Sequence, residues 1–389
     1  MEFKTDKELF DYVRNYAPDS VQSLKDIFSR YILKEVDIGY LLSVIFKRND
    51  ILLIDSRTGK EFEETSIPTS LNFPVLNNTE RHNVGLVYKK YSSTAAVKLA
   101  MEYADPKTEE LKYFLSSNNA GKKDIFIYCW RGGGRSKYLA KLIYDLGYEC
   151  KTLTGGIKSY RREVTGFWSQ KEFPYNLIEI TGLTGSGKTE IIKLLSKSLP
   201  VIDLESAARH YSSLFGHIPY LIQNIPKVKN QSAFENNIYA QIISGTYSHN
   251  FKNLFFIESE SKKVGDFLIP AGLFSKLNTS PCILAESSFE SRVKRIVNDY
   301  FGNDLRGLEP MLSVFREKEK FFRKELSNKI YEKTLLHLAD AEAGKFTEIM
   351  LEEYYDKKYK VKPKTPVLKV NPDNITEAVK NIENYYDNF

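Results

Sequence analysis

Residues 177–196 read LIEITGLTGSGKTEIIKLLS, which is an apolar run, a glycine-rich turn and a helical pattern in direct succession. The turn at 182–189 satisfies the pattern G-x-x-x-x-G-K-[ST], in which glycines let backbone N–H groups surround a phosphate. The residues expected to bind phosphate are Gly182, Gly185, Ser186, Gly187, Lys188 and Thr189. The lysine adds a positive charge, and the threonine hydroxyl reaches a magnesium ion. Any diphosphate suits such a loop, so the pattern does not choose between ATP and another diphosphate.

Two acidic positions downstream are candidates for supporting a metal ion at this loop. Glu258 ends the apolar part of the strand candidate 253–261, where such folds place a magnesium-associated acid. Asp203 lies in another strand candidate, residues 201–206. A solvated strand end explains either carboxylate equally well, so the sequence leaves both interpretations open.

A second glycine-rich loop, CWRGGGRS, occupies residues 129–136. Cys129 ends the apolar strand candidate 124–130, and a helix is expected to begin near Arg135. The glycines between them are Gly132, Gly133 and Gly134. Backbone amides, the helix N-terminus and the guanidinium groups of Arg131 and Arg135 all favour a thiolate at this position. We therefore predict that Cys129 is a nucleophile, with the two arginines and the loop amides holding the oxyanion part of its substrate.

Strands alternate with helices from about residue 50 onwards, which indicates an α/β protein with mostly parallel, helix-covered sheets. The stretch GFWSQKEFPYN at 166–176 is rich in loop residues and separates two such blocks. The predicted division is a helical N-terminal leader at 1–37, a first α/β domain at 38–168, a P-loop NTPase-like α/β domain at 175–345 and a Lys-rich C-terminal extension at 346–389.

Composition indicates a soluble globular protein. The chain has 389 residues, of which 42% are hydrophobic and 27% charged, and the net charge of +6 permits a polyanionic partner without requiring one. No run approaches the roughly 20 apolar residues that span a bilayer, and the first residues lack the apolar core of a signal peptide. We expect a cytoplasmic protein without a membrane partner. Cys150 and Cys282 lie in apolar surroundings and are expected in the core, and the three cysteines lack the spacing of a zinc site or disulfide framework.

The segments around Cys129 narrow its chemistry. The spacing C-x5-R by itself fits sulfurtransferases of the rhodanese type and Cys-dependent phosphatases alike. Residues 54–74, IDSRTGKEFEETSIPTSLNFP, resemble the rhodanese pattern, as do residues 152–164, TLTGGIKSYRREV, with Tyr160 in the aromatic place. The positions that match in the first of these segments are Asp55, Arg57, Glu61 and Pro68. The first α/β domain therefore resembles a rhodanese domain.

The order of motifs along the whole chain resembles one family. YCWRGGGRS, LTGGIKSYRR, ITGLTGSGKTE, VIDLESAARHYSSLFG, QSAFENNI and ESESKKVG follow one another as in the bacterial tRNA 2-selenouridine synthases. The resemblance covers residues 38 to 345. It implies a transferase that acts on the wobble 2-thiouridine of tRNAs for Lys, Glu and Gln and replaces the sulfur with selenium.

The resemblance also implies the co-substrates. Geranyl diphosphate first alkylates the sulfur, and selenium from selenophosphate then displaces the S-geranyl group. Carried onto this chain, Cys129 holds selenium or assists its transfer, while Arg131, Arg135 and the loop amides bind selenophosphate. The P-loop receives the diphosphate of geranyl diphosphate, and a magnesium ion at Thr189 is compatible with that role.

Two positions depart from the family pattern. Gly134 stands where a larger residue, often Met, is expected, which should loosen the cysteine loop. Residues 258–261 read ESES where a D-E-S type sequence is common, which puts the magnesium role of Glu258 in doubt. Candidate contacts to tRNA phosphates, each of which fits an ordinary solvated charge as well, are Arg161, Arg162, Arg209, His210, Arg292, Lys294 and Arg295.

Two other classes of protein share these motifs. One is a Cys-dependent sulfurtransferase or phosphatase fused to a nucleotide kinase or ATPase. The other is a nucleotide-regulated tRNA-binding module without chemistry of its own. The sequence does not determine the oligomeric state.

Overall fold

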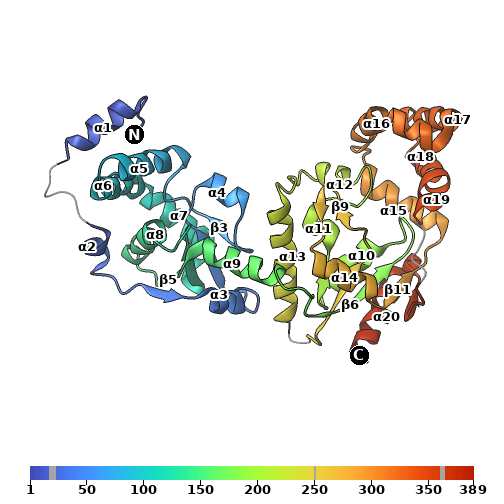
Figure 1. Cartoon of the computed structure of the whole chain (residues 1–389), viewed down its shortest axis with the longest axis horizontal. Helices are drawn as coiled ribbons and strands as arrows, with labels where there is room; N and C mark the ends of the chain where they lie inside the picture. Colours follow the sequence, from blue (N-terminus) through green and yellow to red (C-terminus); the bar gives the residue numbers. More distant parts are fainter. Residues whose placement is uncertain (17–22, 249–250, 360–363) are drawn as a thin grey trace. The chain divides into compact units, whose positions relative to one another are not determined.

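The computed structural model describes residues 1–16, 23–248, 251–359 and 364–389, and these form two compact units, Met1–Phe167 and Trp168–Phe389 (Figure 1). Each unit contains its own five-stranded sheet, in which every pairing of neighbouring strands is parallel. Helices connect successive strands, as parallel pairing requires. The predicted α/β class with mostly parallel sheets is therefore confirmed for both units.

The sheet of the first unit has the strand order β1-β5-β4-β2-β3. Its strands are β1 (Lys34–Val36), β2 (Ile51–Asp55), β3 (Leu71–Asn72), β4 (Asp124–Tyr128) and β5 (Cys150–Leu153). Asp55 pairs with Tyr128, so the central strands β2 and β4 end at the same edge. The residues that follow these strands are therefore gathered at one edge of the sheet.

Nine α-helices accompany this sheet in the described part of the unit. They are α1 (Asp6–Arg14), α2 (Leu24–Phe28), α3 (Ile38–Ile45), α4 (Gly59–Glu64), α5 (Asn78–Lys90), α6 (Ser93–Ala104), α7 (Thr108–Ser117), α8 (Gly134–Asp145) and α9 (Gly156–Trp168). Capping boxes define where α2, α4 and α5 begin, with Ser23, Thr58 and Asn77 as the capping residues.

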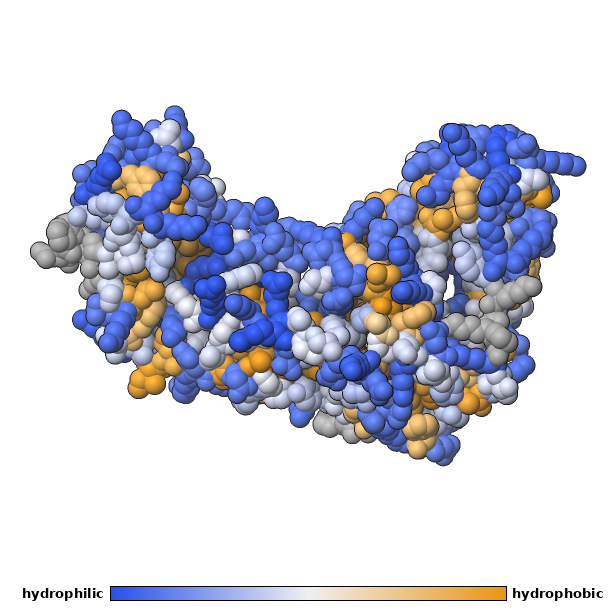
Figure 2. All heavy atoms as spheres, in the orientation of Figure 1, coloured by the Kyte–Doolittle hydropathy of each residue, from blue (hydrophilic) through white to orange (hydrophobic). Residues whose placement is uncertain are grey.

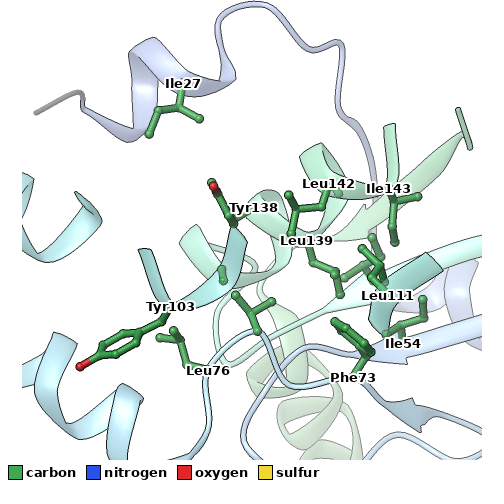
Figure 3. Packing of buried hydrophobic residues seen from close by; sticks show 14 of the residues in the cluster. Ile27, Ile54, Phe73, Leu76, Tyr103, Leu111, Tyr138, Leu139, Leu142 and Ile143 are labelled. Carbon is green, nitrogen blue, oxygen red and sulfur yellow. The ribbon is translucent and has the colours of Figure 1, made fainter. Parts of the chain in front are cut away.

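The N-terminal segment is part of the core of the first unit. Leu9 and Ile27 are buried in the same cluster as residues of α8. Figure 3 shows Ile27 of α2 on the side of α8 that carries Tyr138 and Leu142. Residues 34–36 lie inside the predicted helical leader but form the edge strand β1, because they pair with β5. The part of the predicted leader at 17–22 lies outside the described residues.

The sheet of the second unit has the order β12-β11-β6-β8-β7. Its strands are β6 (Asn176–Thr181), β7 (Val201–Ile202), β8 (Leu254–Glu258), β11 (Cys282–Ala285) and β12 (Leu368–Val370). A short hairpin of β9 (Lys263–Val264) and β10 (Phe267–Leu268) stands apart from it. All five residues of β8 are buried, as expected for a strand covered on both faces.

The helices of the second unit cover the sheet and extend beyond it. They are α10 (Lys188–Leu195), α11 (Leu204–Ala208), α12 (Ile218–Leu221), α13 (Gln231–Thr246), α14 (Ala271–Thr279), α15 (Phe289–Phe301), α16 (Leu308–Glu317), α17 (Glu319–Ala339), α18 (Ala343–Met350), α19 (Asp356–Lys358) and α20 (Ile375–Asp387). Helices α15 to α18 enclose a separate aromatic-rich cluster that includes Phe315, Phe322 and Phe346.

The C-terminal segment, predicted as a Lys-rich extension, supplies a strand and a helix to the second unit. β12 pairs with β11, and α20 buries Ile382 and Tyr386 against the sheet. Lys364 donates to the fully buried Glu179 carboxylate on β6, 2.5 Å away. The sequence pattern did not predict that this segment adds a strand to the sheet, because a three-residue edge strand leaves almost no periodicity to detect.

Hydrophilic residues cover most of the face seen in Figure 2, and the apolar residues on it form small separate patches. Among the described residues, no helix is long and apolar enough to cross a membrane.

Candidate functional site

Cys129 lies at the carboxyl edge of the first sheet. It directly follows β4, which runs between β5 and β2, and its side chain is buried. The Cys129 Sγ atom lies 3.2 Å from Ser136 Oγ, in the first turn of α8. Helix α8 has no side-chain cap, so its first backbone N–H groups are available to an anion near the thiol.

Two glycines hold the cysteine loop against the segment that follows β5. Gly132 and Gly156 both have positive φ, +70° and +57°. A Cβ atom at Gly156 would lie 2.2 Å from the Cys129 carbonyl oxygen, and one at Gly132 would lie 2.5 Å from the Leu153 oxygen. The Ile157 N–H donates to the Cys129 carbonyl at 2.8 Å. The cysteine loop and the second rhodanese-like segment are therefore in direct contact, and glycine is required at both positions.

The two arginines of the cysteine loop have different surroundings. Arg135 donates to both carboxylate oxygens of Glu61, at 2.6 and 3.3 Å, and Arg81 lies 3.5 Å from the same carboxylate. Burial alone would raise the pKa of Glu61, but the hydrogen bonds from Arg135 keep it below its usual value. Arg131 is exposed and has no ion pair within the described ranges. Arg131 is thus the guanidinium that can turn toward an incoming anion, whereas Arg135 is held in place.

The matched residues Asp55 and Arg57 form a fully buried ion pair under this edge of the sheet. Arg57 donates to Asp55 Oδ2 at 2.6 Å and to the Thr65 carbonyl at 2.5 Å. Neither side chain is exposed, so neither can meet a substrate. The Arg57 guanidinium also lies 5.8 Å from the centre of the Tyr128 ring, at the end of β4.

A side chain of the N-terminal segment fills the space beside Gly134. A Cβ atom at Gly134 would lie 3.3 Å from the Leu24 Cδ1 atom of α2. The space that a larger residue would fill is therefore taken by Leu24. The Leu24 side chain therefore packs against the position at which the sequence departs from the family pattern, and the looser cysteine loop expected there stays a prediction.

The P-loop connects β6 to α10 in the second unit. Gly185 and Gly187 have φ of +76° and +90°, which side chains of L-residues rarely adopt. Lys188 Nζ folds back over the loop and donates to the carbonyl oxygens of Gly182 and Leu183, at 2.9 and 3.0 Å. Burial lowers the pKa of Lys188, and the nearby carboxylate of Glu205 opposes that shift.

Glu205 is the acid that contacts the P-loop threonine, and sequence reasoning did not single it out. Thr189 Oγ1 donates to Glu205 Oε2 at 2.8 Å, and the Ser212 N–H donates to the other carboxylate oxygen at 2.9 Å. The backbone N–H of Glu205 in turn donates to Glu258 Oε1 at 2.8 Å. The only available signal was a second acid in VIDLES, two residues after Asp203.

Glu258 and Asp203, the two acids predicted to support a metal ion at the P-loop, have different surroundings. Glu258 is buried at the end of β8, and its Oε2 atom has no hydrogen-bond partner among the described residues. Burial raises the pKa of Glu258 well above its usual value, and the charges of Asp203 and Glu205 add to that rise. Asp203 instead caps α11 by accepting from the Ser206 N–H at 2.7 Å. Glu258 therefore lies beside Glu205, the acid that contacts Thr189. Asp203 instead caps the helix that carries Glu205.

Two arginines predicted as candidate tRNA contacts brace the P-loop instead. Arg292 is buried, donates to the Thr184 carbonyl at 2.8 Å and forms a two-bond ion pair with Asp356. Arg295 pairs with Glu190 at 3.1 Å and reaches the Gly185 carbonyl at 3.4 Å. Their helical spacing of three residues places both on the face of α15 that meets the loop.

The other candidate tRNA contacts are distributed between surface and interior. Arg161, Arg162 and Lys294 are exposed. Arg209 is half-buried and donates to the Pro226 carbonyl at 2.7 Å. His210 is also half-buried and packs against Gly265 of the β9–β10 hairpin.

An apolar cavity of about 30 Å³ adjoins the P-loop at Thr184. Its other walls come from α15, α16, α18 and the segments that flank them, including Ile296, Met311, Met350 and Tyr355. A cavity of this size has room for little more than one water molecule. The walls include two methionine side chains that are buried in the aromatic-rich cluster.

These two sites define a class of protein, in which a rhodanese-like domain with a cysteine loop precedes a P-loop domain of parallel α/β type. Residues 40–163 match the model of the rhodanese-like domain, and residues 175–387 match the model of the tRNA 2-selenouridine synthase AAA domain, which covers more than half of the chain. The chain belongs to the tRNA 2-selenouridine synthase family.

Curated relatives described as tRNA 2-selenouridine synthase agree with this assignment. The protein from Bdellovibrio bacteriovorus is 35% identical over 268 residues, which are 68% of each chain. The protein from Nitrosomonas europaea is 34% identical over 253 residues, and the alignment spans 64% of each chain, slightly less than two thirds. The protein from Azotobacter vinelandii is 29% identical over 333 residues, which are 80% of this chain and 87% of the relative. Among solved structures, the N-terminal domain of a protein from Clostridium difficile 630 is 32% identical, covers 34% of this chain and 98% of that domain, and has a TM-score of 0.31.

Proposed function

We propose that this chain is a tRNA-modifying transferase that converts wobble 2-thiouridine to 2-selenouridine through an S-geranyl intermediate. The observation that carries the proposal is the presence of both the Cys129 loop and the P-loop in a member of this family. In the first step the uridine sulfur attacks C1 of geranyl diphosphate and diphosphate leaves with the bonding electrons. In the second step the selenium of selenophosphate adds at C2 of the base and geranyl thiol leaves, and hydrolysis of the Se–P bond then releases phosphate. A thioether is a better leaving group than a thiolate-like sulfur, which explains the order of the steps.

The P-loop receives the diphosphate. Lys188 and the loop amides neutralise the charge that develops on this leaving group. A diphosphate would replace the Gly182 and Leu183 carbonyls as the partner of Lys188 and would favour its charged form.

Magnesium fits the residues beside Thr189. The Thr189 hydroxyl and the carboxylates of Glu205 and Glu258 are oxygen ligands, and the free Oε2 atom of Glu258 is buried without a partner in the described part of the chain. No group of three or more His, Cys, Asp or Glu side chains among those residues is arranged to hold a metal by itself. The ion would therefore depend on diphosphate oxygens as well, and it would add positive charge at the leaving group.

The cysteine loop receives selenophosphate. The exposed Arg131 and the uncapped N-terminus of α8 bind its phosphate, and the Cys129 thiol assists the transfer while selenium stays bonded to phosphorus until it bonds to C2 of the base. The substrates are the tRNAs for Lys, Glu and Gln, so the reaction takes place in the cytoplasm.

The first test separates the two steps with Cys129→Ser. Purified full-length protein is incubated with 2-thiouridine tRNA, geranyl diphosphate and selenophosphate, and the wobble nucleoside is identified by mass spectrometry. We expect S-geranyl-2-thiouridine to accumulate and 2-selenouridine to disappear. The matched control is Cys150→Ala, because Cys150 is also buried but lies within β5. Formation of 2-selenouridine by the Cys129 variant at the wild-type rate would disprove the assignment of the nucleophile.

The second test uses Lys188→Ala. Geranylation should fall by at least about 100-fold, the range for loss of one charged group that stabilises a leaving anion. Pre-geranylated tRNA should still accept selenium. If both steps are lost together, the P-loop serves tRNA binding or folding instead.

A further inference from the structure

The first unit carries an open hollow of about 520 Å³ along helix α5, which the reaction described above does not use. The lining residues that matter here are Arg81, His82, Gly85, Tyr88, Lys89 and Arg135. All of them except Arg135 belong to α5 itself. The hollow is thus one face of one helix, closed at one end by a residue of the first turn of α8.

Positive charge dominates this hollow. Arg81 and Lys89 are exposed, and Arg135 is half-buried. The carboxylate that faces them is Glu61, which bonds to Arg135 at 2.6 Å and lies 3.5 Å from Arg81. Three cations against one carboxylate leave a positive surplus, which suits a phosphodiester backbone.

Tyr88 adds an aromatic surface to the charged one. Its side chain is 65% exposed although it lines the hollow. An exposed aromatic ring beside a row of cations is the combination by which proteins bind single-stranded nucleic acid, because bases stack on the ring while phosphates meet the cations.

Gly85 forms an open part of the floor of the hollow. It lies in the middle of α5, where glycine weakens a helix relative to alanine. A Cβ atom at this position would have no heavy atom within 4 Å, so packing does not require glycine here. A flat, side-chain-free stretch of helix lets an RNA strand approach the backbone closely.

The hollow ends next to the reactive loop. Arg135 lines it, and the adjacent Ser136 contacts the Cys129 thiol at 3.2 Å. We infer that the α5 hollow binds the single-stranded RNA segment that carries the modified uridine, with Tyr88 stacking on a neighbouring base. This inference rests on the proposed function, because it assigns the anticodon segment of the tRNA to a surface beside Cys129.

The experiment measures binding of 2-thiouridine tRNA to the full-length protein at several salt concentrations. We expect Tyr88→Ala to weaken binding roughly tenfold, within the range for loss of one base stack. Lys89→Ala should lower the slope of log affinity against log salt by about one, because one phosphate contact is lost. Gly85→Leu should weaken binding by filling the hollow while leaving the melting temperature unchanged or higher.

A matched control isolates the hollow. Lys90→Ala removes the same charge one residue away, outside the lining. This variant should bind tRNA as the wild type does. Wild-type binding by the Tyr88, Lys89 and Gly85→Leu variants would overturn the inference and leave the proposed function standing. Absence of tRNA binding by the wild-type protein would overturn both.

Discussion

Cys129 and Cys150 show how position decides what a residue can do. Both are buried in the first unit, each at or next to a strand of the same sheet. Cys150 lies within β5, and burial raises the pKa of its thiol to about 12. Cys129 instead follows the end of β4 and faces the first turn of α8. We therefore expect Cys150 to be inert, because it is enclosed in the sheet, and we keep Cys129 as the candidate nucleophile, because it lies beyond the end of its strand.

The buried Asp299 side chain leads to a prediction about how the stability of the protein depends on pH. Burial raises its pKa to about 6, although Lys193 opposes the shift. An aspartate in the unfolded chain titrates near 3.9, so between about pH 4 and pH 6 the native state holds more protons than the unfolded state. The free energy of unfolding therefore falls as the pH rises through this range and stays low above it.

Replacing Asp299 by Asn removes this pH-dependent contribution to the free energy of unfolding. We expect Asp299→Asn to be more stable than the wild type at pH 7 by about 1–2 kcal/mol, after allowance for partial exposure, and to match it near pH 4. Urea unfolding at pH 4, 5, 6 and 7 measures the difference. A constant offset between the two proteins across these pH values would contradict the assignment.

At the scale of elements, the contact between α2 and the start of α8 links the N-terminal segment to the cysteine loop. Leu24 occupies the space beside Gly134, and Ile27 anchors α2 in the core. Tyr31 and Tyr144 extend the contact by hydrogen bonds to Asp145 and to the Ile32 carbonyl. Helix α2 is therefore a structural support of the loop that carries Cys129.

A double substitution tests this contact. Gly134→Met should overpack the space and destabilise the first unit by about 1–3 kcal/mol. Leu24→Ala should cost stability by itself but should relieve the overpacking caused by Gly134→Met, so that the two effects are not additive. Thermal unfolding of the wild type, the two single variants and the double variant gives the interaction energy. Additive changes would show that the side chains at positions 24 and 134 do not share the same space.

At the scale of the whole molecule, the chain is two units with separate cores. One buried cluster spans α1 to β5 in the first unit, and two others occupy the helical part and the sheet of the second. None of these clusters, as described, draws residues from both units. Each unit also has its own sheet and its own glycine-rich loop.

We predict that residues 1–167 and 168–389 fold when produced separately. Each piece buries its own apolar core and is longer than the minimum length that a domain usually needs to be stable by itself. Circular dichroism should show one cooperative thermal transition for each piece. A piece ending at residue 345 in place of 389 should fail to fold, because it lacks β12 and α20. Failure of the 168–389 piece itself would contradict the division into two units.

The amino-acid sequence by itself determined the two anion loops, the α/β class and the order of the two domains. These features are local, because each loop is a strand, a glycine turn and a helix in direct succession. Lys188, Thr189 and Cys129 could therefore be predicted as site residues from the sequence, together with the loop residues next to them.

Only the tertiary structure decided which distant residues meet these loops. Glu205 reaches Thr189 from 16 positions away, Arg292 reaches Thr184 from 108, and Leu24 fills the space at Gly134. The edge strand β12 joins β11 although more than 80 residues separate them. Parallel sheets pair strands that are remote in the chain, and neither periodicity nor motif spacing records which remote segments become neighbours.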